Sequence, residues 1–475
     1  MAGQSQKPQA PKAGVSWSTQ SANFVRDAIA PALLLFICPF AVNLFSFVLI
    51  NKNFDYGNFY MFVSQFAELL FVQQDSVKAF DFLVVGVFQM PTYNSVKFLL
   101  VFTGVQLLLY KCVPGARFNG PQTENGHVPK YCDNGLVCFL MTNIIFYFLV
   151  VQMEIFPVTF IYDELIPLLT LLNFSSLVLC VFLYLKGLFF PSTQDHGSCG
   201  NFAIDMYWGT ELYPQFLGID LKQFVICRMG MVLWYFFAVS FFFAAERDLR
   251  SKVSEPDYYG NINGQFASVA LMSIYVFKFF CWEKWYLHAA DIQVDRFGFM
   301  LCWGTLAFMP CIHTLQNLFM VHNHTHMSNN VMCLYLIVGN TMTYLNYDSD
   351  TQRHKIRSKI EKCGPKGVVV WGKPVNYILA KYKTNDGEVH TSVLSVSGYN
   401  GLARHFHYLP DIINLFLYCS PAGFTNILPY MYFLYLTILL LDRTYRIDER
   451  CLQKYGNYWR EYCAQVPYKL IPGLW

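Results

Sequence analysis

Three carboxylates lie within or at the ends of long apolar segments of the sequence: Glu283, Asp291 and Asp411. Charged side chains at membrane depth are costly, so each is a functional candidate by default. A carboxyl group held near an apolar pocket can supply a proton to a substrate. The alternative is that each carboxylate pairs with a cation or a backbone group and serves packing, and the residues alone leave both interpretations open.

A second group of reactive residues is cationic and aromatic and lies toward the C-terminus. Arg353 and Arg357 are four residues apart and therefore share one face of a helix. The run Ala-Arg-His-Phe-His-Tyr ends at Tyr408, and Arg450-Cys451 begins a stretch that includes Lys454, Tyr455, Trp459 and Tyr462. Guanidinium groups bind phosphate through paired hydrogen bonds, and aromatic rings offer stacking faces for flat heterocycles. Such a mixture could hold a dinucleotide, whereas the alternative is a basic loop that contacts lipid headgroups.

Four common sequence motifs of cofactor binding and catalysis are absent from the sequence. It contains no G-x-G-x-x-G, no G-x-x-x-x-G-K-[ST], no H-E-x-x-H and no G-x-S-x-G motif. The 15 cysteines are scattered and never form a C-x-x-C pair, so we expect neither a disulfide framework nor a metal site.

The composition describes the elements that must position these residues. Of the 475 residues, 55% are hydrophobic and 14% are charged, against about 25% charged in soluble domains. This excludes an ordinary soluble globule and predicts an all-α polytopic membrane protein. A net charge of +3 without a basic, aromatic-interleaved tract gives no support for a nucleic-acid partner.

About ten apolar segments approach the 20 residues that a membrane-spanning helix requires. They are residues 29–50, 95–113, 135–159, 165–190, 226–245, 264–287, 297–321, 329–347, 408–421 and 423–442. The ninth is short and contains Pro410 and Asp411, which predicts a broken or tilted helix. We expect a flexible cytosolic tail at 1–23 and one transmembrane domain at 24–475.

The loops predict the orientation of the chain in the membrane. Seven Lys and Arg residues lie between Arg353 and Lys373, and six between Arg443 and Lys469. Short basic loops face the cytosol, so ten spans place both termini there. Within the polar stretch 348–407, alternating residues flank Asn385-Asp386-Gly387, which predicts a small cytosolic β-hairpin.

From residue 29 to Trp475 the chain resembles the integral-membrane sterol reductases. The resemblance is specific in Asn201–Pro214, in Trp285-Tyr286-Leu287 with Asp291-Ile292 and Phe297-Gly298, and throughout 397–475. Phe406, the Trp371–Pro374 stretch and the final Pro472-Gly473 are similar to the branch that reduces the C7–C8 double bond of Δ5,7-sterols. The resemblance implies a multi-pass enzyme of the endoplasmic reticulum that takes sterol from the bilayer and NADPH from the cytosol. Reduction at C14, or a non-catalytic sterol-binding relative, remains an alternative.

The resemblance also implies where the cofactor binds, in the part of the chain at about 348–475. The implied contacts are Arg353, Arg357, Arg404, His407, Tyr408, Cys451, Lys454, Tyr455 and Tyr462. Ile447 stands where the family has an Asp, and we expect the following Asp448 to contact the cofactor in its place. The proton donor is left open among Glu283, Asp291, Asp411, Glu211 and the tyrosines. Membrane lipid and other enzymes of sterol synthesis are the remaining expected partners.

Overall fold

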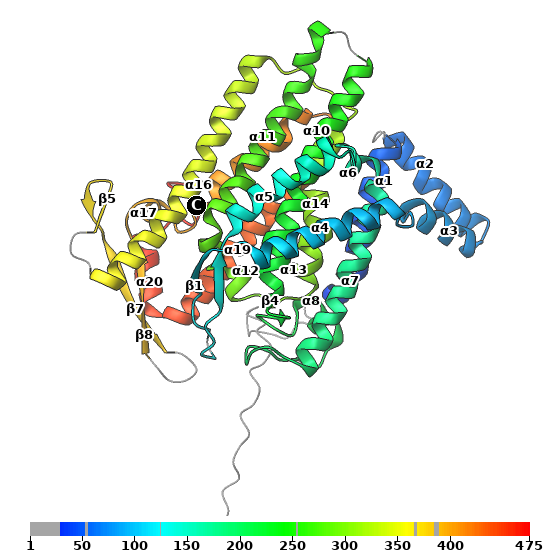
Figure 1. Cartoon of the computed structure of the whole chain (residues 1–475). Coiled ribbons are helices and arrows are strands. Elements are labelled where there is room, and N and C mark those ends of the chain that lie inside the picture. The colour runs from blue at the N-terminus through cyan, green and yellow to red at the C-terminus, as the bar shows by residue number, and fades with distance from the viewer. Residues whose placement is uncertain (1–28, 53–55, 124, 253–254, 365–367, 384–388) are drawn as a thin grey trace, which may run out of the picture.

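The structure is a computed structural model that describes residues 29–52, 56–123, 125–252, 255–364, 368–383 and 389–475 (Figure 1). The predicted tail at 1–23 lies outside the described residues. The described residues fold mainly into helices, and their strands form small two-stranded pairs (Figure 1). The predicted class, a mainly α-helical polytopic membrane protein, is confirmed.

Six helical stretches of the described chain are long and apolar enough to cross a membrane. They are Ala30–Val48, Tyr93–Cys112, Gly135–Gln152, Leu165–Phe189, Leu221–Lys252 and Tyr259–Tyr286. They correspond to the helices α1 (Ala30–Lys52), α4 (Tyr93–Cys112), α5 (Gly135–Tyr147), α7 (Leu165–Phe189), α10 (Met231–Lys252) and α11 (Glu255–Tyr286). Large apolar side chains such as Phe36, Phe174 and Leu100 are exposed on their outer faces, where lipid is the natural solvent.

The other four predicted spans form helices that are interrupted or strongly polar at one end. Residues 297–321 form α13 (Phe299–Trp303), a π-helical turn (Gly304–Phe308), α14 (Met309–Ile312) and α15 (Leu315–Met320). Helix α16 (Asn329–Cys363) continues well beyond its apolar half, α18 (Tyr408–Cys419) has 12 residues, and α19 (Met431–Tyr455) ends in a basic segment. The number of ten spans therefore stays a prediction.

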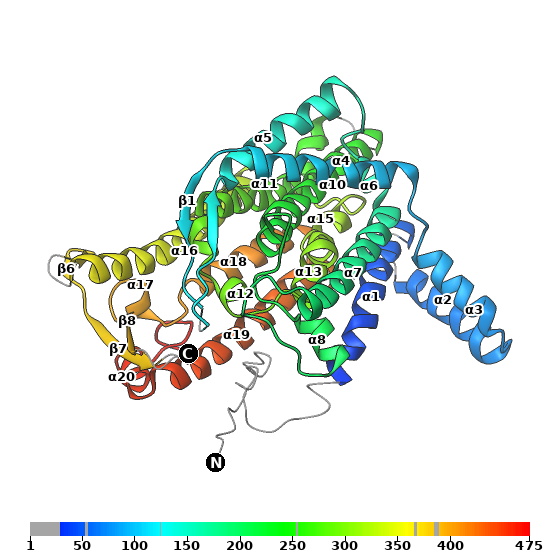
Figure 2. The same ribbon diagram turned by 60° about the horizontal axis from the view of Figure 1, so that its bottom comes forward.

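Two helices that the sequence analysis did not anticipate extend from one side of the body. Helices α2 (Tyr56–Ala67) and α3 (Ser76–Val87) form a pair beside α1 in both views (Figures 1 and 2). The side chain of Asn43 attaches the end of α3 to α1, because its Nδ2 donates to the Val87 carbonyl at 3.3 Å. The shorter helices are α6 (Phe160–Asp163), α8 (Phe202–Trp208), α9 (Leu221–Gln223), α12 (Ala290–Gln293), α17 (Tyr399–Leu402) and α20 (Asn457–Gln465).

Each strand of the described residues pairs with a strand next to it in the sequence, and every pair is antiparallel. The pairs are β1 (Ala116–Asn119) with β2 (Lys130–Asp133), β3 (Gln215–Phe216) with β4 (Ile219–Asp220), β5 (Val369–Val370) with β6 (Lys373–Pro374), and β7 (Tyr377–Lys383) with β8 (Val389–Ser395). The last pair is the predicted hairpin, with Tyr377 opposite Ser395 and Lys383 opposite Val389. Its predicted turn at 385–387 lies outside the described residues.

The C-terminal part of the chain packs on this hairpin and on the loop before α18. Ile378, Ala380 and Leu394 of the hairpin are buried against Trp459 and Tyr462 of α20. The backbone N–H groups of residues 404 and 405 donate to the carbonyls of residues 468 and 469, at 3.0 and 2.8 Å. Helices α16, α19 and α20, the hairpin and the chain end thus gather at one end of the molecule (Figure 2).

Candidate active site

An elongated cavity of about 570 Å³ lies among α10, α11, α16, α18 and α19. The length of the cavity can be measured along helix α19, because side chains of this helix from Tyr432 to Tyr455 line the cavity. At 1.5 Å rise per residue, these positions span roughly 34 Å. The cavity therefore runs from the apolar interior of the bundle to the basic C-terminal segments.

The two ends of the cavity differ in chemistry. One end is apolar and aromatic and is lined by Ile226, Met231, Trp234, Met309 and Tyr432. The other is cationic and aromatic and is lined by Arg353, Arg357, Arg404, Tyr455, Trp459 and Tyr462. This arrangement suits two different ligands, an apolar, lipid-like one at the first end and an anionic, aromatic one at the second.

The guanidinium groups at the cationic end are only partly neutralised by the protein. Arg353 pairs with Asp350 at 3.0 Å, but its Nε has no hydrogen-bond partner among the described residues. Arg357 Nε donates to the Val393 carbonyl at 3.1 Å. No described carboxylate lies within ion-pair distance of Arg357. A partly buried cation without a counter-ion favours an anionic ligand.

His354 is a further aromatic residue at the cationic end of the cavity. His354 lies between the two arginines on α16 and stacks on Trp285, with ring centroids 4.6 Å apart. Burial, and then the neighbouring Arg353, lower the pKa of His354 to about 3. The ring is therefore neutral at pH 7 and adds an aromatic face to the cavity wall.

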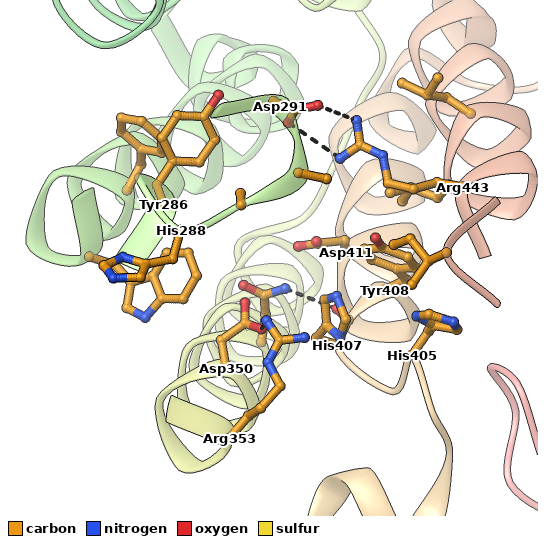
Figure 3. A pocket seen from close by; sticks show the side chains of 18 of the residues that line it. Tyr286, His288, Asp291, Asp350, Arg353, His405, His407, Tyr408, Asp411 and Arg443 are labelled. Atoms are coloured by element: carbon orange, nitrogen blue, oxygen red, sulfur yellow. Dashed lines mark hydrogen bonds and ion pairs between the residues drawn. The ribbon is translucent and has the colours of Figure 1, made fainter. Parts of the chain in front are cut away.

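The middle of the cavity contains the ion pair between Asp291 and Arg443 (Figure 3). The guanidinium group of Arg443 donates to both carboxylate oxygens, at 2.7 and 3.4 Å. Lys222 fixes the turn that carries Asp291, because its Nζ donates to the carbonyls of Ile292 at 2.8 Å and Asp295 at 2.5 Å. Asp291 is thus held as a paired carboxylate that orients Arg443.

Asp411 faces the same part of the cavity from α18 (Figure 3). Its Oδ1 has no hydrogen-bond partner among the described residues. Nearby, Lys278 donates to the Asn346 side chain, whose Nδ2 donates to the His407 carbonyl at 2.9 Å. Asp411 therefore combines access to the cavity with a free oxygen, which Asp291 lacks.

Eight of the ten residues expected to contact the cofactor line this cavity. They are Arg353, Arg357, Arg404, His407, Tyr408, Cys451, Tyr455 and Tyr462. A hydrogen bond positions the Tyr462 side chain, because its hydroxyl donates to the Asn400 carbonyl at 3.3 Å. Burial raises the pKa of the Cys451 thiol to about 11, so it lines the cavity as a neutral group.

The remaining two, Asp448 and Lys454, do not line the cavity. The Asp448 carboxylate accepts from Arg404 Nη2 at 3.0 Å and lies 3.4 Å from His405 Nε2. Burial opposes its ionisation, but the neighbouring His405 and Arg404 outweigh this and keep the pKa of Asp448 below its usual value. The Lys454 ammonium lies 4.1 Å from the centre of the Tyr382 ring. At the position of the family's Asp, Ile447 itself lines the cavity.

Glu283 and Glu211 belong to buried ion pairs outside the cavity wall. Arg228 Nη1 donates to both oxygens of Glu283, at 2.8 and 2.9 Å, and Gln223 donates to one of them at 3.1 Å. Glu211 accepts from Lys186 at 2.8 Å. Their contacts are those of carboxylates that fix packing.

The sequence analysis did not single out several polar residues of the cavity wall. They are Lys278, His288, His313, Asn346, Asp350 and His354. Asp350, Arg353, His354 and Arg357 follow the i, i+3, i+4, i+7 spacing of one helix face, so the two known arginines could have revealed their neighbours. Lys278 is a charged residue inside an apolar segment and carried the same signal as the carboxylates.

The helical membrane body that contains this cavity belongs to a known class of proteins. Residues 29–475 match the profile of the Ergosterol biosynthesis ERG4/ERG24 family, and the chain belongs to that family. The 7-dehydrocholesterol reductase of Arabidopsis thaliana is 38% identical over 393 residues, which cover 82% of this chain and 88% of the relative. That of Xenopus laevis is 33% identical over 398 residues, 81% of each chain. The Delta(14)-sterol reductase of Methylotuvimicrobium alcaliphilum is 33% identical over 386 residues, 81% of this chain and 84% of the relative.

Proposed function

We propose that this protein reduces the C7–C8 double bond of Δ5,7-sterols with NADPH, in the membrane of the endoplasmic reticulum and with both termini in the cytosol. The observation that carries the proposal is a continuous cavity that joins a cationic, aromatic end to an apolar end. Two of the relatives described above are named 7-dehydrocholesterol reductases, and the Arabidopsis protein has the higher identity. The names of these relatives support the proposal that the reduced double bond is C7–C8.

The residues at the cationic end fit a phosphorylated dinucleotide. Arg357 has no described carboxylate to neutralise it, and the Nε atoms of Arg353 and Arg404 lack hydrogen-bond partners among the described residues. Arg353, Arg357 and Arg404 would hold the phosphates, and Tyr455 and Tyr462 would pack against the flat rings. Most of these contacts come from the segment 348–475. Bound NADPH would supply the hydride that the reaction requires.

The apolar end fits the sterol and excludes water. Met231, Met309, Leu436 and Trp234 line it, and rings and thioethers of this kind pack well against a flat hydrocarbon. Water exclusion strengthens every electrostatic interaction within the cavity. It also protects a carbocation formed by protonation of the diene from capture by water.

Among the candidate carboxylates, Asp411 has the contacts that best fit a proton donor. It lines the cavity and keeps one oxygen free of hydrogen bonds, whereas Asp291 is held by both donors of Arg443. Glu283 and Glu211 are engaged by Arg228 and Lys186 away from the cavity wall. A protonated Asp411 would transfer its proton to the diene, and the Asp291–Arg443 pair would fix the adjoining wall.

Reduction at C14 is the second candidate, because a Delta(14)-sterol reductase covers the chain at 33% identity. Purified protein incubated with NADPH and either 7-dehydrocholesterol or a Δ8,14-diene sterol distinguishes the two by product analysis. We expect conversion of 7-dehydrocholesterol to the Δ5 product. Conversion of the Δ8,14-diene alone would assign the activity to C14, and conversion of neither sterol would indicate a non-catalytic relative.

A further inference from the structure

His313 is a polar ring in the apolar wall of the cavity, and the proposed function gives it no role. It lies between α14 and α15 and lines the cavity. Its ring stacks on Tyr432, with centroids 4.1 Å apart and planes 23° apart, and meets Trp234 edge-on at 5.4 Å. These aromatic contacts fix the plane of the imidazole within the wall.

One ring nitrogen of His313 has no hydrogen-bond partner in the described part of the chain. Nδ1 of His313 has no hydrogen-bond partner among the described residues, and neither has the indole Nε1 of Trp234 beside it. The backbone of the segment is in contrast well bonded, since Gln316 Nε2 donates to the His313 carbonyl at 2.8 Å. Buried polar groups without partners cost free energy and are rare. An imidazole that a fixed backbone holds in an apolar wall therefore points to a hydrogen bond with a ligand.

The position of His313 along the cavity indicates which part of a ligand it meets. Tyr432, on which it stacks, precedes Arg443 by eleven residues of α19, or roughly 16 Å along the helix. Leu436 and Leu439 line the cavity between them. His313 thus lies beyond an apolar stretch, at the far side from the arginines that suit phosphate.

We propose that the imidazole ring of His313 binds the 3β-hydroxyl group of the sterol. The inference rests on the proposed function, because it requires a sterol in the apolar half of the cavity. A sterol carries one hydroxyl group on an otherwise apolar body, and imidazole can donate to or accept from a hydroxyl group. This contact would set the direction in which the sterol enters and the depth that it reaches.

Sterol binding to the full-length protein in detergent, without NADPH, tests the assignment. The two ligands are 7-dehydrocholesterol and its 3-deoxy analogue, which lacks only the hydroxyl group. We expect the wild-type protein to prefer the hydroxylated sterol by about three- to tenfold, the value of one neutral hydrogen bond. In His313→Phe, which retains a ring to stack on Tyr432, the ratio of the two affinities should fall to about one.

Thr305→Val is the matched control, because Thr305 lines the same wall but its hydroxyl already donates to the Leu301 carbonyl. We expect it to leave the ratio of affinities as in the wild type. An unchanged ratio in a folded His313→Phe protein overturns the inference, and so does a wild-type ratio of about one. If the ratios behave as expected but no sterol is reduced, the proposed function fails while this contact stands.

Discussion

Arg357 is the guanidinium group at the cationic end that no described carboxylate neutralises, so its charge is available to a ligand phosphate. We expect Arg357→Ala to raise the apparent KM for NADPH about ten- to hundredfold, the effect of losing one charged hydrogen bond. The KM for the sterol should change much less. Steady-state kinetics with each substrate varied in turn measure both.

Arg460→Ala is the control, because it also removes one arginine charge but at a position outside the cavity. Arg460 is exposed on α20, and its described contact is with Asn457 at 3.4 Å. The control substitution should leave both KM values close to those of the wild type. Equal changes in the two KM values of Arg357→Ala, or none, would reject the assignment of Arg357.

Glu283 is buried with Arg228, so its substitution should act on stability. Breaking a buried ion pair costs about 3–5 kcal/mol, and Glu283→Gln leaves the Arg228 charge without its carboxylate. We expect a clearly lower thermal midpoint in detergent. Glu246→Gln, which removes an exposed pair with Arg250, should cost under about 1 kcal/mol. A Glu283→Gln protein with wild-type stability and no turnover would instead assign Glu283 a catalytic role.

Asp448 acts on the cavity through its neighbours, because it holds Arg404 and lies beside His405, and both line the wall. Without this carboxylate Arg404 keeps its bonds to the Val466 and Pro467 carbonyls, at 2.7 and 3.0 Å, but loses its counter-ion, and both side chains lose a fixed neighbour. We expect Asp448→Asn to weaken NADPH binding by about ten- to hundredfold, and Glu449→Gln to have little effect. Titration of NADPH into both variants decides, and an unchanged dissociation constant for Asp448→Asn contradicts this positioning role.

At the scale of elements, the β7–β8 hairpin supports the cationic end of the cavity. Its Val393 carbonyl accepts from Arg357, and Leu394 and Ser395 line the cavity. Ala380 of β7 is fully buried, whereas the preceding Leu379 is 48% exposed on the other face of the strand. Successive side chains of a strand point to opposite faces. Substitutions at these two positions therefore compare the buried face of the strand with its exposed face.

We therefore expect Ala380→Glu to destabilise this end of the molecule by more than about 2 kcal/mol and to weaken NADPH binding. Leu379→Glu should change the free energy of unfolding by no more than about 0.5 kcal/mol. Thermal unfolding and NADPH titration of both variants test the packing. Similar effects of the two substitutions would contradict the described face of the hairpin.

The sequence could predict the elements whose signal is local. Long apolar runs located α1, α4, α5, α7, α10 and α11, and alternating residues located the hairpin. The pair α2 and α3 was missed, since neither helix reaches the length of a membrane span. The break of 297–321 into short helices was also missed, because hydropathy does not report hydrogen-bond register.

At the scale of the whole molecule, the cavity depends on contacts between segments that are distant in the sequence. Arg357 and Cys451 could be grouped because charged and aromatic residues are dense around both. His313 could not be placed beside Tyr432, because one histidine in an apolar segment carries no spacing signal. The pairing of Asp291 with Arg443 spans 152 residues and follows only from the packed bundle.

If one cavity brings a hydride donor and a Δ5,7-sterol together, the hydride of NADPH must appear in the reduced sterol. Reduction of 7-dehydrocholesterol in ordinary water, with NADPH deuterated at the transferable position of the nicotinamide ring, tests this. We expect a Δ5 product with one deuterium, at C7 or C8, while the second hydrogen comes from a solvent-exchangeable acid of the protein. A product without deuterium, or no product from a folded protein, would contradict this expectation.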